Sequence, residues 1–247
     1  MTTNTNSTDT KALLQRRALQ SKQSVDLNTW IFDQFKFNPE AVVLELCCGV
    51  GTQTRAFLDQ LGSGTITAVD INSESLDHAS KEIVDDRVNF VASDIDDVDN
   101  YLNQKFDVIF CSYGFYYSKD SDRLFKHLRD YLREEGKFIL VGPVKGNNEQ
   151  IFRVVREIGC AIADSVLYSS EQFMLDHLTA FLSSFSKIKF CRITNDVCYE
   201  EPQLLLEYWR NTTFYTPQHD KEFLEACDGL FPEGLSVTKS IGYLEGS

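Results

Sequence analysis

Short apolar runs alternate with amphipathic segments along residues 42–141 of the chain. The apolar runs lie at residues 42–45, 65–69, 88–91, 106–110 and 138–141, and the segments with helical periodicity lie at residues 55–61, 74–84 and 122–132. Apolar runs of this length are typical of buried strands. Strands that alternate with helices at this spacing predict a parallel sheet with helices on both faces. Within this region we also expect Ser73 to cap a helix and residues 134–137 to form a turn.

The pattern changes on either side of this region. Residues 1–9 are polar and are expected to be disordered, and residues 11–20 and 27–35 predict helices. After Pro143, residues 148–158, 170–182, 202–212 and 221–230 predict helices, and residues 188–193 and 236–244 predict strands. No linker rich in Pro, Gly or Ser interrupts the chain. We therefore expect one domain over residues 10–247, made of an N-terminal helical arm (10–38), a core (40–143), and a helical cover with the last strands (144–247).

Composition narrows the class of protein. The 247 residues are 43% hydrophobic with a formal net charge of −13, which predicts a globular protein with no general attraction to nucleic acid. The seven cysteines lack metal-type spacing, so we expect reduced thiols in a cytoplasmic protein and no bound metal. Neither a signal peptide nor a membrane-spanning run is visible in the sequence, so we expect no membrane association.

The expected strands end in polar or glycine-rich groups. Glu45, Asp70 and Asp94 follow three of them, and Cys111 to Tyr117 follow a fourth. Ligands on parallel sheets bind outside the carboxyl ends of the strands. Four such ends in a row are hard to attribute to packing, and they predict a binding site at this edge.

The turn after the first strand fits two classes of nucleotide-like ligand. A dinucleotide-binding turn of the form G-x-G-x-x-G that starts at Gly49 needs a third glycine where Thr54 stands. Glu45 also lies just before the turn, where it would repel a pyrophosphate. The sequence therefore favours a nucleoside ligand without a pyrophosphate.

The second class resembles the class I S-adenosylmethionine-dependent methyltransferases, of the small-molecule type. The resemblance rests on motifs spread over residues 40–141, and they are Glu45-Leu-Cys47-Cys48-Gly49-Val-Gly51, Ala68-Val-Asp-Ile71, Ala92-Ser-Asp-Ile95, Phe106-Asp-Val-Ile-Phe110 and Leu132-Arg-Glu-Glu-Gly-Lys-Phe-Ile-Leu140. It implies a Rossmann-like fold with a mostly parallel seven-stranded sheet, helices on both faces and a helical cover over the carboxyl edge. It also implies S-adenosylmethionine as the cofactor.

The resemblance assigns roles to individual residues. Asp70 would accept hydrogen bonds from the ribose hydroxyls, and Asp94 would accept one from the adenine amino group. Ile71 and Ile95 would flank the adenine. Glu45 would orient backbone or contact the amino end of the cofactor through water. The methionine part would be bordered by Cys47, Cys48, Gly49, Gly51 and the Cys111 carbonyl.

Cys47 departs from the family motif, because it stands where the family usually has its first glycine. A thiol is small, and it fits near a cofactor if the backbone needs no positive φ at that position. We therefore expect tighter packing here and retained cofactor binding.

Two groups of aromatic residues are candidates for the wall of an acceptor pocket. The substrate-binding candidates are Tyr113, Tyr116, Tyr117, Tyr208 and Trp209. Core packing is the alternative role for each of them. His177 and His219 are candidate bases, although methyl transfer to a neutral nucleophile needs none.

These observations predict a methyltransferase that acts on a small-molecule acceptor, such as a metabolite, a sugar or a natural-product intermediate. No Asn-Pro-Pro-Tyr-like signature follows the fourth strand, where Cys111-Ser-Tyr-Gly stands. Methylation of a protein or tRNA is the alternative reaction. A subunit that binds the cofactor without catalysis is the alternative outside enzymes.

Overall fold

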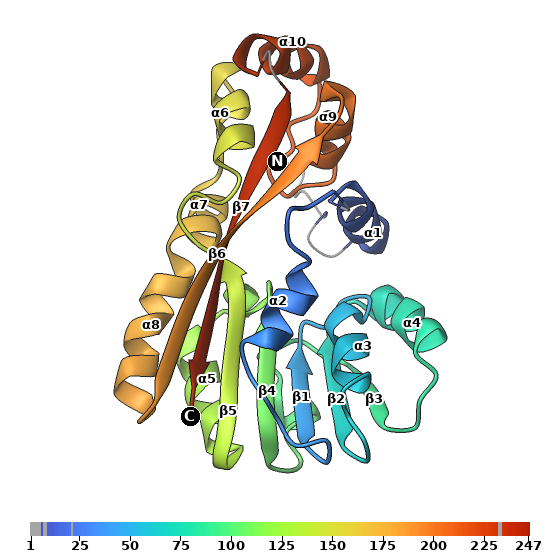
Figure 1. Ribbon diagram of the computed structural model, residues 1–247, viewed down its shortest axis with the longest axis vertical. Coiled ribbons are helices and arrows are strands. Elements are labelled where there is room, and N and C mark those ends of the chain that lie inside the picture. Colours follow the sequence, from blue (N-terminus) through green and yellow to red (C-terminus); the bar gives the residue numbers. More distant parts are fainter. Residues whose placement is uncertain (1–5, 7–8, 21, 232–233) are drawn as a thin grey trace. The chain divides into compact units, whose positions relative to one another are not determined.

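The computed structural model describes residues 6, 9–20, 22–231 and 234–247 (Figure 1). Most of the predicted disordered tail, at residues 1–5 and 7–8, lies outside the described residues. Asp9 is described, and its carboxylate caps the first helix by accepting a hydrogen bond from the backbone N–H of Ala12 at 2.6 Å. Among the described residues, no helix is both long and apolar enough to cross a bilayer.

The elements follow one another in the order that the sequence predicts. The strands are β1 (Val42–Leu46), β2 (Thr65–Asp70), β3 (Val88–Ala92), β4 (Phe106–Ser112), β5 (Leu132–Pro143), β6 (Ile188–Tyr199) and β7 (Leu235–Gly246). The α-helices are α1 (Thr10–Leu19), α2 (Leu27–Asp33), α3 (Thr52–Leu58), α4 (Ser73–Glu82), α5 (Ser121–Asp130), α6 (Glu149–Glu157), α7 (Asp164–Glu171), α8 (Phe173–Ser184), α9 (Pro202–Arg210) and α10 (Asp220–Leu230). Short 3₁₀ helices are η1 (Val98–Asn100) and η2 (Phe115–Tyr117).

The strands form a seven-stranded sheet in the order β3-β2-β1-β4-β5-β7-β6. The pairings that join β3, β2, β1, β4 and β5 are all parallel. Figure 1 shows β7 running in the opposite direction to β5. The predicted mostly parallel seven-stranded sheet is therefore confirmed. The order reverses between β1 and β4, so the carboxyl ends of these strands lie at the switch point where ligands bind to such sheets.

Helices cover both faces of this sheet. Phe110 of β4 contacts Phe57 of α3, with ring centroids 5.2 Å apart. Phe138 of β5 pairs in register with Ile109, the neighbour of Phe110, so the side chain of Phe138 points to the opposite face. On that face it contacts Phe125 of α5 at 5.2 Å and Phe181 of α8 at 5.5 Å. Aromatic side chains therefore fill both layers between the sheet and its helices.

The chain divides into two compact units, and the predicted single domain over residues 10–247 stays a prediction. Unit 2 comprises residues 27–142, 174–191 and 242–247, and it contains the parallel part of the sheet. Unit 1 comprises residues 1–26, 143–173 and 192–241. Unit 1 has a hydrophobic core of its own. Residues of α6 and α9, of the last part of β6 and of the first part of β7 contribute to it. The expected helical cover over the carboxyl edge stays a prediction.

Local differences from the predicted elements have physical causes. The cap of α4 is Asn72 rather than Ser73, because the Asn72 Oδ1 accepts hydrogen bonds from two backbone N–H groups of the first turn, at 2.9 and 3.2 Å. The expected turn at residues 134–137 lies inside β5, where the register with β4 shifts between Phe106 and Val108. The predicted helix 170–182 corresponds to α8, which begins at Phe173, and it is preceded by a helix that was not predicted, α7, which ends at Glu171.

Candidate functional site

Glu45 lies at the end of β1 and is buried, with 1% of its surface exposed. Its Oε2 accepts a hydrogen bond from the Thr54 hydroxyl in α3 at 2.6 Å. Burial raises the pKa of Glu45 to about 8, because the charged form loses its hydration, and the hydrogen bond from Thr54 opposes this shift. Glu45 thus holds the start of α3 against β1. The expected contact with the amino end of a cofactor stays a prediction.

The glycine turn between β1 and α3 needs its glycines. Gly51 precedes α3 with φ +79°, and a Cβ there would lie 2.9 Å from the Ile83 side chain and 3.2 Å from the Ala79 Cβ. The backbone N–H of Gly49 donates a hydrogen bond to the Asp70 Oδ2 at 2.7 Å. The turn is therefore tied to the end of β2, and its backbone faces the carboxyl edge.

Cys47 adopts a positive φ of 56°, contrary to the condition that we attached to a thiol at this position. Left-handed backbone costs a residue with a Cβ about 1 kcal/mol or more. The opposing residue is Gly114, at which an added Cβ would overlap the Cβ and Sγ of Cys47. The missing side chain at Gly114 thus makes room for the extra side chain at Cys47.

The thiols around the turn are held in the protonated form. A hydrogen bond with the Cys111 thiol, together with burial, raises the pKa of Cys47 well above its ordinary value. Burial raises the pKa of Cys48 in the same way. Cys111 ends β4 beside Leu46, with which it pairs in register. Cys47 and Cys48 therefore stay uncharged at the switch point.

Asp70 joins the glycine turn to the loop after β2. Besides the Gly49 N–H, its carboxylate accepts the backbone N–H of Asn72 at 2.9 Å. Burial raises the pKa of Asp70, whereas the backbone N–H donors lower it. A carboxylate has about four acceptor positions, so the two bonds leave room for further donors. The next residue, Ile71, is 59% exposed, which is unusual for a large apolar side chain and fits a position that a ligand covers.

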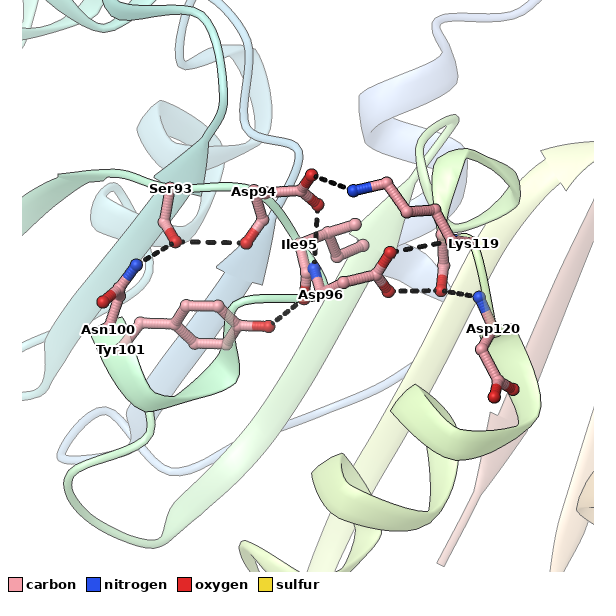
Figure 2. Close-up of polar contacts among 9 residues, drawn as sticks. Ser93, Asp94, Ile95, Asp96, Asn100, Tyr101, Lys119 and Asp120 are labelled. Atoms are coloured by element: carbon pink, nitrogen blue, oxygen red, sulfur yellow. Dashed lines mark hydrogen bonds and ion pairs between the residues drawn. The ribbon is translucent and has the colours of Figure 1, made fainter.

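Asp94 lies in a braced loop after β3 (Figure 2). Its carboxylate accepts the Asp96 backbone N–H at 3.0 Å and the Lys119 ammonium at 2.9 Å. The hydrogen bond from Asp96, and then the one from Lys119, lowers the pKa of Asp94. The Tyr101 hydroxyl donates to the carbonyl of Ile95, whose side chain is buried. The loop is thus held in place before any ligand binds.

The same loop is bonded to the segment that follows β4. The Asp96 carboxylate accepts a hydrogen bond from the Ser118 hydroxyl at 2.5 Å. It also accepts one from the Lys119 backbone N–H at 2.8 Å, and Figure 2 shows Asp96 and Lys119 side by side. On the other side of the loop, the Asn100 amide donates to the Ser93 hydroxyl at 3.0 Å. The loops after β3 and β4 therefore form one connected rim at the carboxyl edge.

The aromatic residues after β4 lie beside this rim. The rings of Tyr116 and Tyr117 lie 4.7 Å apart, and Tyr117 is 52% exposed. Burial raises the pKa of Tyr116, and the neighbouring groups Tyr117, Tyr113 and Cys111 raise it further. Tyr113 has φ +57°, a second left-handed residue at this edge. Tyr116 thus lies near Cys47 and Cys111, and Tyr113 and Tyr117 lie near Tyr116.

The candidate base His177 lies in α8 and is buried. Its ring meets the ring of Phe115 edge-on, with centroids 5.7 Å apart. His219 precedes α10 in unit 1. The role of either histidine as a base stays a prediction.

The remaining substrate candidates, Tyr208 and Trp209, lie in α9 of unit 1. Trp209 is fully buried, its ring stacks on Phe223 with centroids 4.4 Å apart, and its indole N–H donates to the carbonyl of Phe214 at 3.1 Å. The Tyr208 hydroxyl accepts a hydrogen bond from Lys239 at 2.7 Å. The contacts of Trp209 are those of core packing, the alternative that the sequence left open. A substrate-binding role for either residue stays a prediction.

Sequence reasoning missed several residues that shape the site. Thr54 was used only to argue against a dinucleotide, although a hydroxyl nine positions after Glu45 is a possible partner for a buried carboxyl. The sequence gives no indication of the roles of Lys119, Asp96 and Ser118, because their hydrogen bonds join loops that are distant in sequence. Within the described part of the chain, no group of three or more His, Cys, Asp or Glu could hold a metal ion.

Comparison with known proteins agrees with this geometry. Residues 43–136 match the family model described as a methyltransferase domain. A malonyl-[acyl-carrier protein] O-methyltransferase of Priestia megaterium is 28% identical over 103 residues, which are 42% of this chain and 37% of that protein. The matched part therefore spans less than half of that relative.

Two solved structures have a similar fold. The YcgJ protein from Bacillus subtilis has a TM-score of 0.63 at 16% identity, over 89% of this chain and 96% of that one. A methyltransferase assigned in Bacillus halodurans has a TM-score of 0.61 at 13% identity, over 89% and 97%. At this identity the likeness concerns the fold alone.

The sheet order, the glycine turn and the acids at successive strand ends define a Rossmann-like fold of the class I methyltransferase type. Residues 43–136, which match the methyltransferase-domain model, form the part of this fold that carries the glycine turn and the acids.

Proposed function

We propose that this protein is an S-adenosylmethionine-dependent methyltransferase that acts on a small-molecule acceptor, either free or bound to a carrier. The observation that carries the proposal is the grouping of Glu45, the glycine turn, Asp70 and Asp94 at one edge of unit 2. These groups come from successive strand ends and are positioned by hydrogen bonds within the protein. Such preorganisation favours a single bound geometry for the cofactor.

The residues present fit the cofactor that the methyltransferase domain implies. The remaining acceptor positions of Asp70 suit the ribose hydroxyls, and those of Asp94 suit the adenine amino group. Exposed Ile71 would cover one face of the adenine. The side chains of Cys47 and Cys111 and the tyrosines after β4 would surround the methionine part, where aromatic rings attract a sulfonium.

The bound cofactor would supply an activated methyl group. The protein would hold the acceptor in line with this group and exclude water, and these two effects provide much of the rate gain in such reactions. The tyrosines Tyr113, Tyr116 and Tyr117 are suited to both tasks because they are large, and Tyr117 is exposed beside the rim. A base is needed only if the acceptor must lose its proton before attack.

The acceptor class is supported by two observations. The net charge of −13 disfavours nucleic acid. The similar malonyl-[acyl-carrier protein] O-methyltransferase acts, by its name, on a small acyl group attached to a carrier protein. A small acceptor joined to a carrier is therefore within the proposed class.

The reaction can be tested with labelled cofactor. The purified full chain is incubated with methyl-labelled S-adenosylmethionine and fractionated metabolites, with and without acyl-carrier protein. Label in small molecules or in carrier-bound acyl groups supports the proposal. Label in other proteins or in tRNA supports the alternative reaction, and no transfer despite tight binding identifies a non-catalytic binding subunit.

A further inference from the structure

Unit 1 contains a buried cation with neutral partners. Lys239 of β7 is 7% exposed. Its ammonium donates hydrogen bonds to the Asn148 Oδ1 and, at 2.7 Å, to the Tyr208 hydroxyl oxygen. The ammonium also lies 4.2 Å from the centroid of the Tyr208 ring. Both hydrogen-bond partners are uncharged, so the positive charge of Lys239 is not neutralised by them.

No ion pair of the described residues includes Lys239, although the chain carries an excess of acidic residues. The nearby acid Asp196 accepts the Thr238 hydroxyl at 2.8 Å, which places those two side chains together on one face of the β6–β7 pair. Lys239 follows Thr238 in the strand and therefore points to the opposite face. A buried charge without a counter-charge is costly unless something else compensates it.

Three side chains that can donate hydrogen bonds meet at this point, and each has an N–H or O–H group without an acceptor among the described residues. The Lys239 ammonium has a third N–H. The Tyr208 hydroxyl accepts from Lys239, so its own O–H is available to donate, and the Asn148 amide NH₂ is available because its oxygen is the atom that binds Lys239. No described residue accepts from these donors. Tyr208 is 5% exposed and Asn148 is 7% exposed, so water reaches them poorly.

The backbone holds these donors in position. The Asn148 N–H donates to the carbonyl of Thr238 at 2.8 Å, and Asn148 has φ +58° immediately before α6. The neighbouring strand β6 contributes Asn195, whose amide is already bonded to the Ser24 hydroxyl and to both backbone groups of Val25. Asn195 therefore has little capacity left to satisfy Lys239.

We propose that Lys239, Tyr208 and Asn148 of unit 1 form a binding site for an oxyanion, which is a carboxylate or a phosphate group. The site supplies one positive charge and donors of three kinds, which is the chemistry that such a group needs. It also gives Tyr208 a role that its place in the core of unit 1 does not explain.

The first test uses the unaltered full chain. Acetylation of lysines by an N-hydroxysuccinimide ester is followed by peptide mass spectrometry in malonate, inorganic phosphate or chloride at equal ionic strength. We expect malonate or phosphate to slow acetylation of Lys239 about tenfold relative to chloride, since charge-assisted hydrogen bonds of this kind stabilise a complex to that extent. Exposed Lys145 is the internal control and is expected to react alike in all three salts.

Protection by malonate alone identifies a carboxylate site, and protection by phosphate alone identifies a phosphate site. Equal rates at Lys239 in all three salts would overturn the proposal.

The second test compares the variants K239Q and Y208F with the control K145Q. Malonate or phosphate is expected to raise the unfolding midpoint of the wild type and of K145Q, relative to chloride. The rise is expected to be smaller in Y208F and to be absent in K239Q. S-adenosylhomocysteine is expected to bind all four proteins with the same Kd. An undiminished response in folded K239Q contradicts the anion site, whereas absent S-adenosylhomocysteine binding in every protein contradicts the proposed function instead.

Discussion

At the scale of single residues, Cys47 and Gly114 form a complementary pair. Cys47 carries a side chain where its left-handed backbone favours glycine, and Gly114 leaves the space that this side chain fills. Cys47 itself and Tyr113, which directly precedes Gly114, both have a positive φ. Strained backbone of this kind often accompanies functional sites.

Gly114→Ala tests this pair. The added Cβ would overlap Cys47, and overpacking of this sort is expected to lower the free energy of unfolding by about 1–3 kcal/mol. Cys47→Gly removes the obstructing side chain, so the double variant is expected to recover most of the loss. Denaturant unfolding of the four proteins measures the coupling. Additive effects would show that the two residues do not compete for the same space.

Glu45 makes stability depend on pH. Its pKa is about 8 in the folded chain and lies near 4.5 when the group is unperturbed. Between these values the folded protein holds a proton that the unfolded chain releases. The contribution of Glu45 is therefore complete below about pH 4.5 and is lost as the pH rises towards 8.

Glu45→Gln removes this titration. From pH 5 to pH 8 the wild type is expected to lose roughly 2–4 kcal/mol of unfolding free energy more than the variant does. The control Glu40→Gln, at an exposed position, is expected to follow the wild type. Chemical denaturation at several pH values measures the difference. Parallel curves for the wild type and Glu45→Gln would contradict the buried neutral carboxyl.

At the scale of elements, the loops after β3 and β4 support each other. The Asp96 carboxylate accepts hydrogen bonds from both the Ser118 hydroxyl and the Lys119 backbone N–H. This one carboxylate therefore connects two loops that flank the expected adenine position. The Lys119–Asp94 ion pair adds to this rim, but the Lys119 side chain is 78% exposed, and such pairs contribute little to stability.

Asp96→Ala is expected to loosen the rim without unfolding the sheet. Amide hydrogen exchange of residues 113–119 should accelerate about tenfold, because the loss of these bonds lowers the local opening free energy. The β1 and β4 amides should keep their protection. Asp97→Ala is the neighbouring control, and unchanged exchange at residues 113–119 in Asp96→Ala would show that the bonds do not hold the loop.

The elements were largely predictable, because hydrophobic periodicity and strand-end motifs are local signals. Strands β1 to β4 begin where the sequence predicts them, and α6, α9 and α10 lie within two residues of their predicted starts. The break between α7 and α8 and the bulge in β5 were not predictable, since both depend on packing and register with distant residues. The positive φ of Cys47 also needs its partner Gly114, which lies far away in sequence.

At the scale of the whole molecule, the chain builds two hydrophobic cores, and this division was not visible in the sequence. Chain segments return to both units, and β6 and β7 contribute residues to each. The passages from one unit to the other in β6 and β7 therefore run through regular strands, and composition gives no signal there. The candidate site residues of unit 2 stand in motifs that the sequence shows, whereas the donors around Lys239 do not.

Trp209→Ala tests the core of unit 1. Loss of the ring that stacks on Phe223 is expected to lower the free energy of unfolding by about 3–5 kcal/mol. Trp209→Phe keeps one ring but loses part of the buried indole and the hydrogen bond to Phe214, so its cost should be smaller, about 1–3 kcal/mol. The rate of hydrogen exchange at the backbone amides of α9 and α10 should rise most in Trp209→Ala. Equal stability of the two variants would contradict the packing role of this side chain.

The central claim is that the carboxyl edge of unit 2 binds the adenosine cofactor through Asp70, and calorimetric titration with S-adenosylhomocysteine tests it most directly. The wild type and the control Asp77→Asn, at an exposed position in α4, are expected to bind with equal Kd. Asp70→Asn is expected to bind at least about tenfold more weakly, because it loses charge-assisted hydrogen bonds to the ribose. Equal affinity of Asp70→Asn and the wild type, or no binding by the wild type, would contradict the account.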